Sequence, residues 1–291
     1  MRILVTIPHY HGPTRAAFQR AAYGSTGSDA AVRIGALRAS ITALHHHFSF
    51  QAVMYSDIGR AVLRPPGGGR SHTLDIVVVT TGGRHLLDGL GLPGGLFNHR
   101  EVVTDPMALG FACHEVLTEN LGRYDYYCFM EDDLVITDQN FFDKLTWFNE
   151  KFGAESVLFP NRYETLLSAP CKKLYIDRAT LENLPEQSAS PDDRRAIHEA
   201  FLARPLVLKR PSNPHSGCFF LNEAQFRTWR EQPYFLDRNA GFVGPLESAA
   251  TLGVMRTFKI YKPWDDWPGF LEIHHACNRY LGRIIMGTPG T

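Results

Sequence analysis

The segment YDYYCFMEDDLVITDQNFF, residues 124–142, joins a strongly apolar run to three consecutive acids. Apart from one aspartate, its first seven residues are aromatic or aliphatic, which is typical of a strand buried on both faces. Glu131, Asp132 and Asp133 follow at once, and the chain then becomes apolar again before a helix-like start. We therefore expect a central strand that delivers three carboxylates to one end of a sheet.

The first half of the chain alternates strand-like and helix-like segments. Apolar residues recur at helical spacing from Ile34 to Phe48, and Asp105 followed by Pro106 is a typical helix start. We expect strands at 2–7, 50–55, 74–81, 101–103 and 124–130, a loop at 64–72, and helices at 32–48 and 106–121. This alternation predicts a mostly parallel sheet with helices on both faces.

The second half has a looser pattern. We expect short strands at 157–163, 173–176, 218–221 and 258–261, helices at 223–230 and 245–254, and a polar loop entering a helix over 184–200. No internal repeat is present. We therefore interpret the chain as a single α/β domain, 1–291, in which a C-terminal elaboration follows the first sheet.

Composition argues against several classes of protein. Lys plus Arg and Asp plus Glu both number 30, and this zero net charge argues against a nucleic-acid binder. The five cysteines are scattered without a CxxC pair, which indicates a reducing compartment. No segment approaches the roughly 20 apolar residues of a membrane span, and the N-terminal apolar run is too short for a signal peptide. We expect a cytoplasmic protein without a transmembrane segment; peripheral membrane contact stays open.

The three adjacent acids need a counter-charge, because carboxylates at one strand end repel one another. Mg²⁺ or Mn²⁺ suits them, since these ions take one or two protein carboxylates and complete their shell with phosphate and water. Neither GxxxxGK[ST] nor a GxGxxG after a strand occurs, which excludes the two common phosphate-binding loops. A metal–diphosphate site is the favoured interpretation, and a solvated acidic turn is the alternative.

The segment FMEDDLVITDQNFFDKL, 129–145, resembles the region around the metal-binding DxD motif of nucleotide-sugar glycosyltransferases of the GT-A fold. It is particularly similar to the EDD segment of the N-acetylglucosaminyltransferase I family, in which EDDL, an apolar residue and FF recur in this order. The resemblance covers 129–142 in letters and about 1–150 in architecture. It implies a GT-A-like (Rossmann-like) fold, with a nucleotide-binding half at 1–137 and an acceptor-binding half at 138–291.

The resemblance also implies roles for residues at the strand ends. Asp133 would ligate the metal, and Asp132 and Glu131 would face the ribose or a metal-bound water. The pocket of the donor base would be lined by residues that follow two other strands, namely Pro8, His9, Tyr10, Thr80 and Thr81. This family often has an acid where the chain has the two threonines, so uracil is favoured by family habit alone.

Two histidines near the C-terminus are further candidates for the metal. His274 and His275 lie in EIHHACNRY, 272–280, and many enzymes of this fold use a C-terminal histidine as a metal ligand. Adjacent residues on a strand point to opposite faces, so we expect only one of them to reach the metal. A surface histidine pair is the alternative.

Sugar transfer with inversion needs a base that removes the proton of the acceptor hydroxyl. Glu247 begins a helix after Gly-Pro, an order similar to the family pattern, although a glutamate at this place also suits the helix dipole. The rival base is Asp265 or Asp266. The flanking rings of Trp264 and Trp267 suit a sugar platform, or a tight turn with packed rings. We rank Glu247 first and Asp266 second.

The stretch HSGCFFL fits the wall of a pocket for the acceptor or the donor sugar. His215 and Ser216 offer hydrogen bonds, and Gly217 would let a ligand approach the backbone. Arg33 and Arg38 lie five residues apart on the first expected helix. We interpret both as surface charges, with contact between one of them and a diphosphate as the alternative.

These patterns predict a glycosyltransferase that depends on Mn²⁺ or Mg²⁺. It would move a sugar from a nucleotide-diphosphate sugar, with a UDP-sugar favoured, to a glycan or another hydroxyl acceptor, with inversion. One alternative is a nucleotidyltransferase of similar fold, although its Gly-rich phosphate loop is missing from PHYHGPTR after the first strand. The other alternative is a non-enzymatic module that binds carbohydrate or metal.

Overall fold

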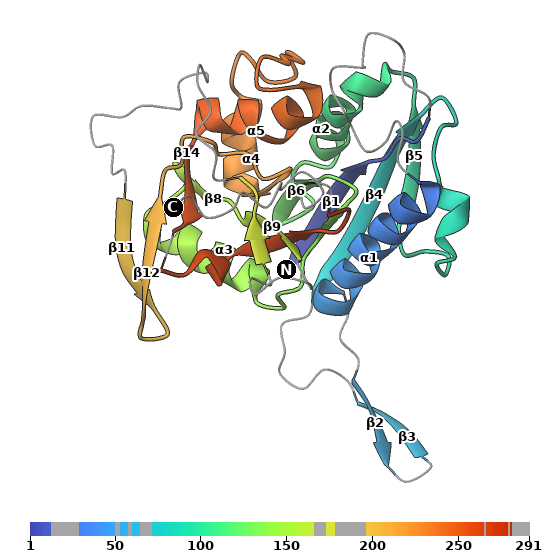
Figure 1. The fold of residues 1–291 in the computed structure, drawn as a ribbon, viewed down its shortest axis with the longest axis horizontal. Coiled ribbons are helices and arrows are strands. Elements are labelled where there is room, and N and C mark those ends of the chain that lie inside the picture. Colours follow the sequence, from blue (N-terminus) through green and yellow to red (C-terminus); the bar gives the residue numbers. More distant parts are fainter. Residues whose placement is uncertain are drawn as a thin grey trace, which may run out of the picture.

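Strand β1, Arg2–Pro8, lies in the middle of a five-stranded sheet in the computed structural model of this protein. It pairs in parallel with β4, Thr73–Thr81, on one side and with β6, Tyr126–Met130, on the other. The parallel strand β5, Asn98–Val102, forms one edge (Figure 1), and the antiparallel strand β13, Cys218–Asn222, forms the other. The carboxyl ends of β1, β4 and β6 therefore lie at the same end of the sheet.

The structure describes residues 1–12, 29–49, 53–57, 60–64, 72–165, 173–177, 196–264, 266–278 and 280. Most of the loop predicted at 64–72, the first part of the one predicted at 184–200, and Asp265 lie outside these residues. Within them, no helix is long and apolar enough to cross a membrane.

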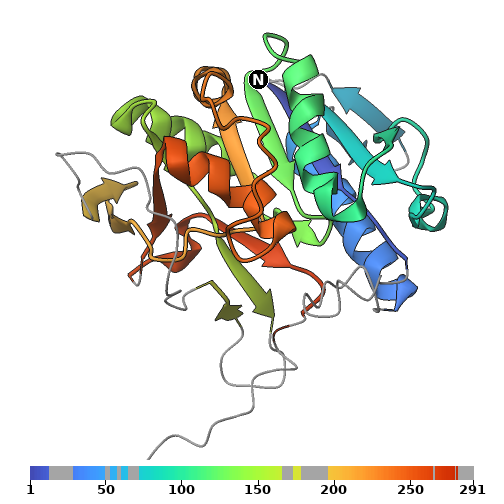
Figure 2. The same cartoon turned by 90° about the horizontal axis from the view of Figure 1, so that it is seen from above.

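Alternate residues of the central strands enter two separate hydrophobic cores. Ile3, Val5 and Ile7 point to one face of the sheet. This face is covered by α1, Ala30–Phe48, and α3, Phe141–Phe152. Leu4 and Phe129 point to the other face. Figure 2 gives the view onto that face. Three helices cover that face: α2 (Leu109–Glu119), α4 (Glu223–Arg230) and α5 (Pro245–Thr257).

Local sequence fixes where several of these helices begin. Asp29 caps α1, because its side chain accepts a hydrogen bond from the backbone N–H of Ala31. Asn222 and Gln225 form a reciprocal capping box at α4. Asp105 caps a 3-10 turn, Pro106–Ala108, that leads directly into α2.

Three smaller sheets complete the described fold. The first has the order β10 (Lys173–Tyr175), β9 (Asn161–Thr165), β15 (Glu272–His275), β7 (Leu134–Val135). The second has the order β11 (Ala196–Phe201), β12 (Arg204–Lys209), β14 (Lys259–Pro263), β8 (Ser156–Leu158). The third is the hairpin of β2 (Val53–Asp57) and β3 (Arg60–Arg64). Because β15 pairs with β7, strand β15 lies beside the acids.

The expected α/β architecture is confirmed, with a mostly parallel central sheet and helices on both faces. The helix expected at the end of 184–200 is wrong, because 196–201 is strand β11, paired with β12. Its sequence AIHEAF contains good helix formers, and the pairing with β12 overrides that local preference. The strand expected at 101–103 lies at 98–102, and the one expected at 157–163 is divided between β8 and β9.

His114 on α2 is an ionisable group in the core between α2, α5 and the sheet. The rings around it are those of Phe111, Phe129, Phe219 and Trp229, and its Nε2 lies 3.0 Å from the carbonyl oxygen of Ala249. Burial lowers the pKa of His114 to about 4, although this carbonyl opposes the shift. The folded protein therefore holds His114 as a neutral imidazole.

We expect His114 to destabilise the fold as pH falls from about 6.5 to about 4. The pKa of His114 is lower in the folded protein than in the unfolded chain, so the unfolded chain takes up the proton first as pH falls. The free energy of unfolding is therefore not reduced by His114 above pH 6.5, and it is lower by roughly 3 kcal/mol at pH 4. Urea denaturation across this range should show a shallower pH dependence for His114→Phe than for the wild type. His198→Phe, at an exposed histidine, should keep the wild-type slope. An unchanged slope in His114→Phe would contradict the assignment.

Candidate functional site

The three acids follow β6 directly and are all buried. Glu131, Asp132 and Asp133 are 8%, 7% and 8% exposed. Their backbone is held from two sides: the N–H of Glu131 donates to the carbonyl of Gly217, and the carbonyl of Asp133 accepts from the N–H of Ala276. The acidic segment is therefore a fixed part of the interior, and the alternative of a solvated acidic turn is wrong.

Asp132 is held by a histidine and an arginine. The Nε2 atom of His9 accepts a hydrogen bond from the backbone N–H of Leu86 at 3.1 Å, so the ring proton lies on Nδ1. Nδ1 donates to Asp132 Oδ2 at 2.6 Å, and Arg33 Nη2 donates to Asp132 Oδ1. Burial alone would raise the pKa of Asp132, but the charge of Arg33 and the bond from His9 keep it below its usual range.

Asp133 shares Arg33 and has a second positive partner. Arg33 Nη1 donates to Asp133 Oδ2 at 2.9 Å, and His275 Nε2 lies 3.4 Å from the same oxygen. The other nitrogen of His275 lies 2.7 Å from a carboxylate oxygen of Glu164. Burial opposes charge on both groups, yet the pKa of Asp133 is well below its usual range and that of His275 is raised to about 9. The two groups therefore form an ion pair at neutral pH.

Glu131 behaves differently from its two neighbours. Burial and the negative charges of Asp133 and Glu247 raise the pKa of Glu131 to about 8, although Arg162 opposes this shift. Arg162 Nη1 lies 3.4 Å from Glu131 Oε2, while its other nitrogens bind both carboxylate oxygens of Asp177 at 2.9 and 2.7 Å. Glu131 is therefore largely protonated at neutral pH, next to two ionised aspartates.

Gly217 makes room for the side chain of Glu131. Its φ angle is +65°, a conformation that suits glycine, and a Cβ atom there would lie 2.8 Å from Glu131 Oε2 and 2.9 Å from Glu131 Cδ. We predicted that a ligand would approach the backbone of Gly217. In the structure, the side chain of Glu131 occupies that space.

One carboxylate oxygen of the cluster has no partner. Both oxygens of Asp132 and one oxygen of Asp133 are taken, whereas Asp133 Oδ1 is buried without a hydrogen bond among the described residues. Among all the described residues, no group of three or more His, Cys, Asp and Glu side chains is arranged to hold a metal ion. The cluster therefore fits only an ion that takes one protein ligand here and the rest from phosphate and water, as Mg²⁺ and Mn²⁺ do.

The two C-terminal histidines separate as the strand pattern predicts. His275 faces Asp133, whereas the ring of His274 stacks on Tyr163 on the other face of β15, with centroids 5.2 Å apart. His274 as a metal ligand beside Asp133 is therefore wrong. His275 carries a proton as it stands, so it would have to lose that proton before it could bind a metal.

The residues predicted to line the donor base lie at the ends of β1 and β4. Pro8 ends β1, His9 binds Asp132, and Tyr10 follows with a half-buried side chain. Thr80 and Thr81 are buried at the end of β4 and are hydrogen-bonded within the protein. Thr80 Oγ1 lies 2.7 Å from His99 Nε2, and Thr81 Oγ1 donates to the carbonyl of Thr104 at 2.9 Å. These hydroxyls already serve the fold.

His215 and Ser216 are buried before β13. His215 Nε2 lies 3.8 Å from Glu131 Oε1, and its Nδ1 lies 3.0 Å from Thr251 Oγ1. Burial and the nearby charge of Arg162 hold the pKa of His215 well below its usual range, so the ring is neutral. Ser216 is fully buried, and its hydroxyl donates to the carbonyl of Pro160 at 2.7 Å, so the expected bond from Ser216 to an acceptor is wrong.

The two candidate bases lie in different surroundings. Glu247 lies in the first turn of α5, half-buried, and its charge acts on Glu131. Asp266 is exposed on a turn after β14.

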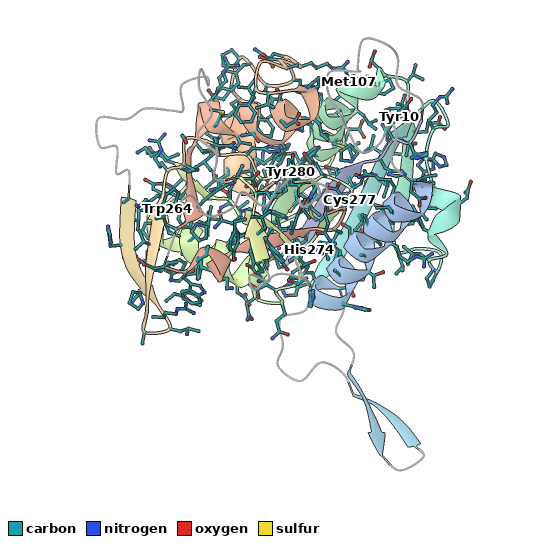
Figure 3. All side chains as sticks on the ribbon, in the orientation of Figure 1. Tyr10, Met107, Trp264, His274, Cys277 and Tyr280 are labelled. Atoms are coloured by element: carbon teal, nitrogen blue, oxygen red, sulfur yellow. The ribbon has the colours of Figure 1, made fainter. Side chains whose placement is uncertain are left out.

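The two tryptophans beside Asp266 pack against β12. Lys209 lies over the ring of Trp264 at 4.8 Å, and Arg204 lies over the ring of Trp267 at 3.9 Å. Figure 3 draws Trp264 well apart from His274 and Cys277. The structure therefore brings Glu247, but not the Trp264–Trp267 turn, to the acids.

The sequence interpretation missed the positive charges of the site. Arg33, expected on the surface, is 5% exposed and binds two of the acids, whereas Arg38 is exposed as expected. Arg162 and Lys262 are buried on β9 and β14, and Lys262 interrupts an otherwise apolar run, Ile260 to Trp264. A charged residue inside a strand of this kind needs a partner, and that signal could have indicated Lys262.

Comparison with known proteins finds no matching family model and no matching curated sequence. The chemistry of the site is therefore inferred from its geometry and from the local resemblance of the EDD segment.

Replacing Arg162 by methionine should destabilise the protein strongly. The change leaves Glu131 and Asp177 buried without their shared counter-charge, and loss of one partner of a buried ion pair costs about 3–5 kcal/mol. Arg100→Met is the matched control, because it opens an ion pair with Glu119 whose side chains are 50% and 52% exposed. It should cost no more than about 1 kcal/mol. Equal losses in urea denaturation would show that the Arg162 cluster contributes nothing beyond a surface pair.

Proposed function

We propose that this protein is a glycosyltransferase that moves a sugar from a nucleotide-diphosphate sugar, with UDP favoured, to a hydroxyl acceptor with inversion, using Mn²⁺ or Mg²⁺. The observation that carries the proposal is the buried oxygen Asp133 Oδ1, which has no hydrogen bond among the described residues and lies just beyond the carboxyl end of β6, a parallel neighbour of β1. A buried carboxylate oxygen in that position calls for a cation or a hydrogen-bond donor, and a divalent ion that brings phosphate and water with it meets that need. The local resemblance of the EDD segment to the DxD motif of GT-A enzymes supports the same choice.

The donor would bind across the carboxyl ends of β1, β4 and β6, where ligands of open α/β sheets bind. Pro8, His9 and Tyr10 end or follow β1 and would border the nucleotide. Glu131, protonated at neutral pH, would donate a hydrogen bond to a hydroxyl of the donor, whereas the ionised Asp132 would accept one.

Asp133 would hold the metal ion through Oδ1, while Arg33 and His275 fix its other oxygen. The ion would supply Lewis-acid neutralisation of the charge that develops on the leaving diphosphate. Glu247 would accept the proton of the acceptor hydroxyl. Its position in the first turn of α5 and its electrostatic effect on Glu131 support this role over that of Asp266.

Asp133→Asn should abolish metal-dependent nucleotide binding. The change removes the charge at Oδ1 and keeps the shape of the side chain, so we expect affinity for UDP or GDP with Mn²⁺ to fall by more than about tenfold. The measurement is calorimetric titration of each nucleotide into metal-free protein, with and without Mn²⁺. Asp143→Asn, at an exposed acid on α3, is the control and should bind as the wild type does. If the wild type binds neither nucleotide in any condition, the glycosyltransferase proposal fails.

Glu247→Gln should slow turnover without weakening donor binding. Loss of a general base lowers the rate about 10²–10⁴-fold, and the amide keeps the volume of the side chain. The assay is release of UDP from a panel of UDP-sugars, first with water and then with sugar hydroxyls as acceptors. Glu155→Gln, whose side chain is 87% exposed, is the control. A wild-type protein that binds nucleotide but never releases UDP would favour the non-enzymatic binding module.

A further inference from the structure

The guanidinium of Arg33 is only partly used by the protein. Nη1 donates to Asp133 Oδ2 at 2.9 Å and to Cys277 Sγ at 3.4 Å, and Nη2 donates to Asp132 Oδ1. Nε is buried and has no hydrogen-bond partner among the residues that the structure describes. Arg33 thus has one N–H that is shielded from solvent and meets no acceptor in the described part of the chain.

Such an atom needs an acceptor from outside the described chain, because a buried N–H without one is costly. Asp133, which Arg33 binds, has the complementary need: its buried acceptor Oδ1 receives no hydrogen bond from the described residues. The two atoms do not satisfy each other, since both lack a partner. An occupant that satisfies both must present an acceptor oxygen to Nε and a positive charge or a donor to Oδ1.

We infer that Arg33 binds the diphosphate of the donor, with Nε–H donating to a phosphate oxygen while Nη1 and Nη2 hold the two aspartates. The inference rests on the proposed donor site and names a residue of it. A phosphate coordinated to a divalent ion meets both requirements, and a guanidinium can serve several acceptors because its five N–H groups are fixed in one plane. A bound water also meets both requirements, so the test must separate phosphate from water.

Arg38 provides a matched comparison on the same helix. It lies five residues further along α1, is exposed, and its Nη2 lies 3.4 Å from the carbonyl of Gly89. An Arg→Lys change at either position keeps the positive charge and removes Nε–H together with the planar fork. Only the change at position 33 should therefore affect a diphosphate.

The experiment is calorimetric titration of inorganic pyrophosphate at saturating Mn²⁺ into the wild type, Arg33→Lys and Arg38→Lys. Pyrophosphate carries the part common to all such donors, so the result does not depend on the base or the sugar. We expect Arg33→Lys to weaken pyrophosphate binding about tenfold or more, the loss of one charge-assisted hydrogen bond. Binding of Mn²⁺ alone should weaken less than binding of pyrophosphate, and Arg38→Lys should match the wild type.

Three results would overturn the inference. Equal pyrophosphate affinity in the wild type and Arg33→Lys would mean that water, and not phosphate, meets Nε. An equal loss for Mn²⁺ alone would mean that Arg33 acts only on the aspartates. Failure of the wild type to bind pyrophosphate would remove the site. By contrast, an Arg33-dependent pyrophosphate site that rejects UDP and GDP would refute the glycosyltransferase and leave Arg33 as a ligand of a metal-bound diphosphate from another compound.

A second measurement keeps the test valid if Arg33→Lys does not fold. In the wild-type protein with Mg²⁺, the Nε–H resonance of Arg33, assigned through its side-chain connectivities, should move downfield when pyrophosphate is added, because the proton gains a charged acceptor. The Nε–H resonance of Arg38 is the internal control and should stay in place. No movement at Arg33 would overturn the inference.

Discussion

Three buried carboxylates on consecutive residues are tolerated only when counter-charges and donors reach them from elsewhere in the chain. Here these groups come from four separate segments: His9 after β1, Arg33 on α1, Arg162 on β9 and His275 on β15. Each of these residues is itself buried, so each segment must pack closely against the end of β6. The position of the small sheet β10–β9–β15–β7 relative to the central sheet follows from this requirement.

The same arrangement gives three neighbouring acids three different properties. Asp132 and Asp133 share the guanidinium of Arg33 and stay ionised, whereas burial and the charge of Asp133 keep Glu131 protonated near neutral pH, because its partner Arg162 is also bound to Asp177. A hydrogen-bond donor and two anions thus stand side by side on one strand end. Environments that separate the pKa values of adjacent acids are typical of catalytic sites.

The sequence predicted the elements whose signal is local. The buried strands around Val5, Val78 and Cys128, and the helix that ends at Phe48, have clear apolar patterns and were found. Strand β11 was missed, because its letters favour a helix and only pairing with β12 makes it a strand.

In the site, the acids and the divergence of His274 from His275 could be predicted, since both depend on adjacent residues. The pairing of Arg33 with Asp132 and of Arg162 with Glu131 could not, because the two residues of each pair lie 99 and 31 positions apart in the chain. A sequence pattern does not show which of many arginines pairs with an acid at such a distance along the chain.

The central position of β15 has a consequence for how the chain folds. This strand comes last among the described strands, yet it lies between β9 and β7, so the small sheet stays split until β15 is in place. During synthesis from the N-terminus, the acids after β6 leave the ribosome long before His275 does. They stay hydrated or are paired elsewhere in the meantime, and the site assembles only after β15 has been synthesised.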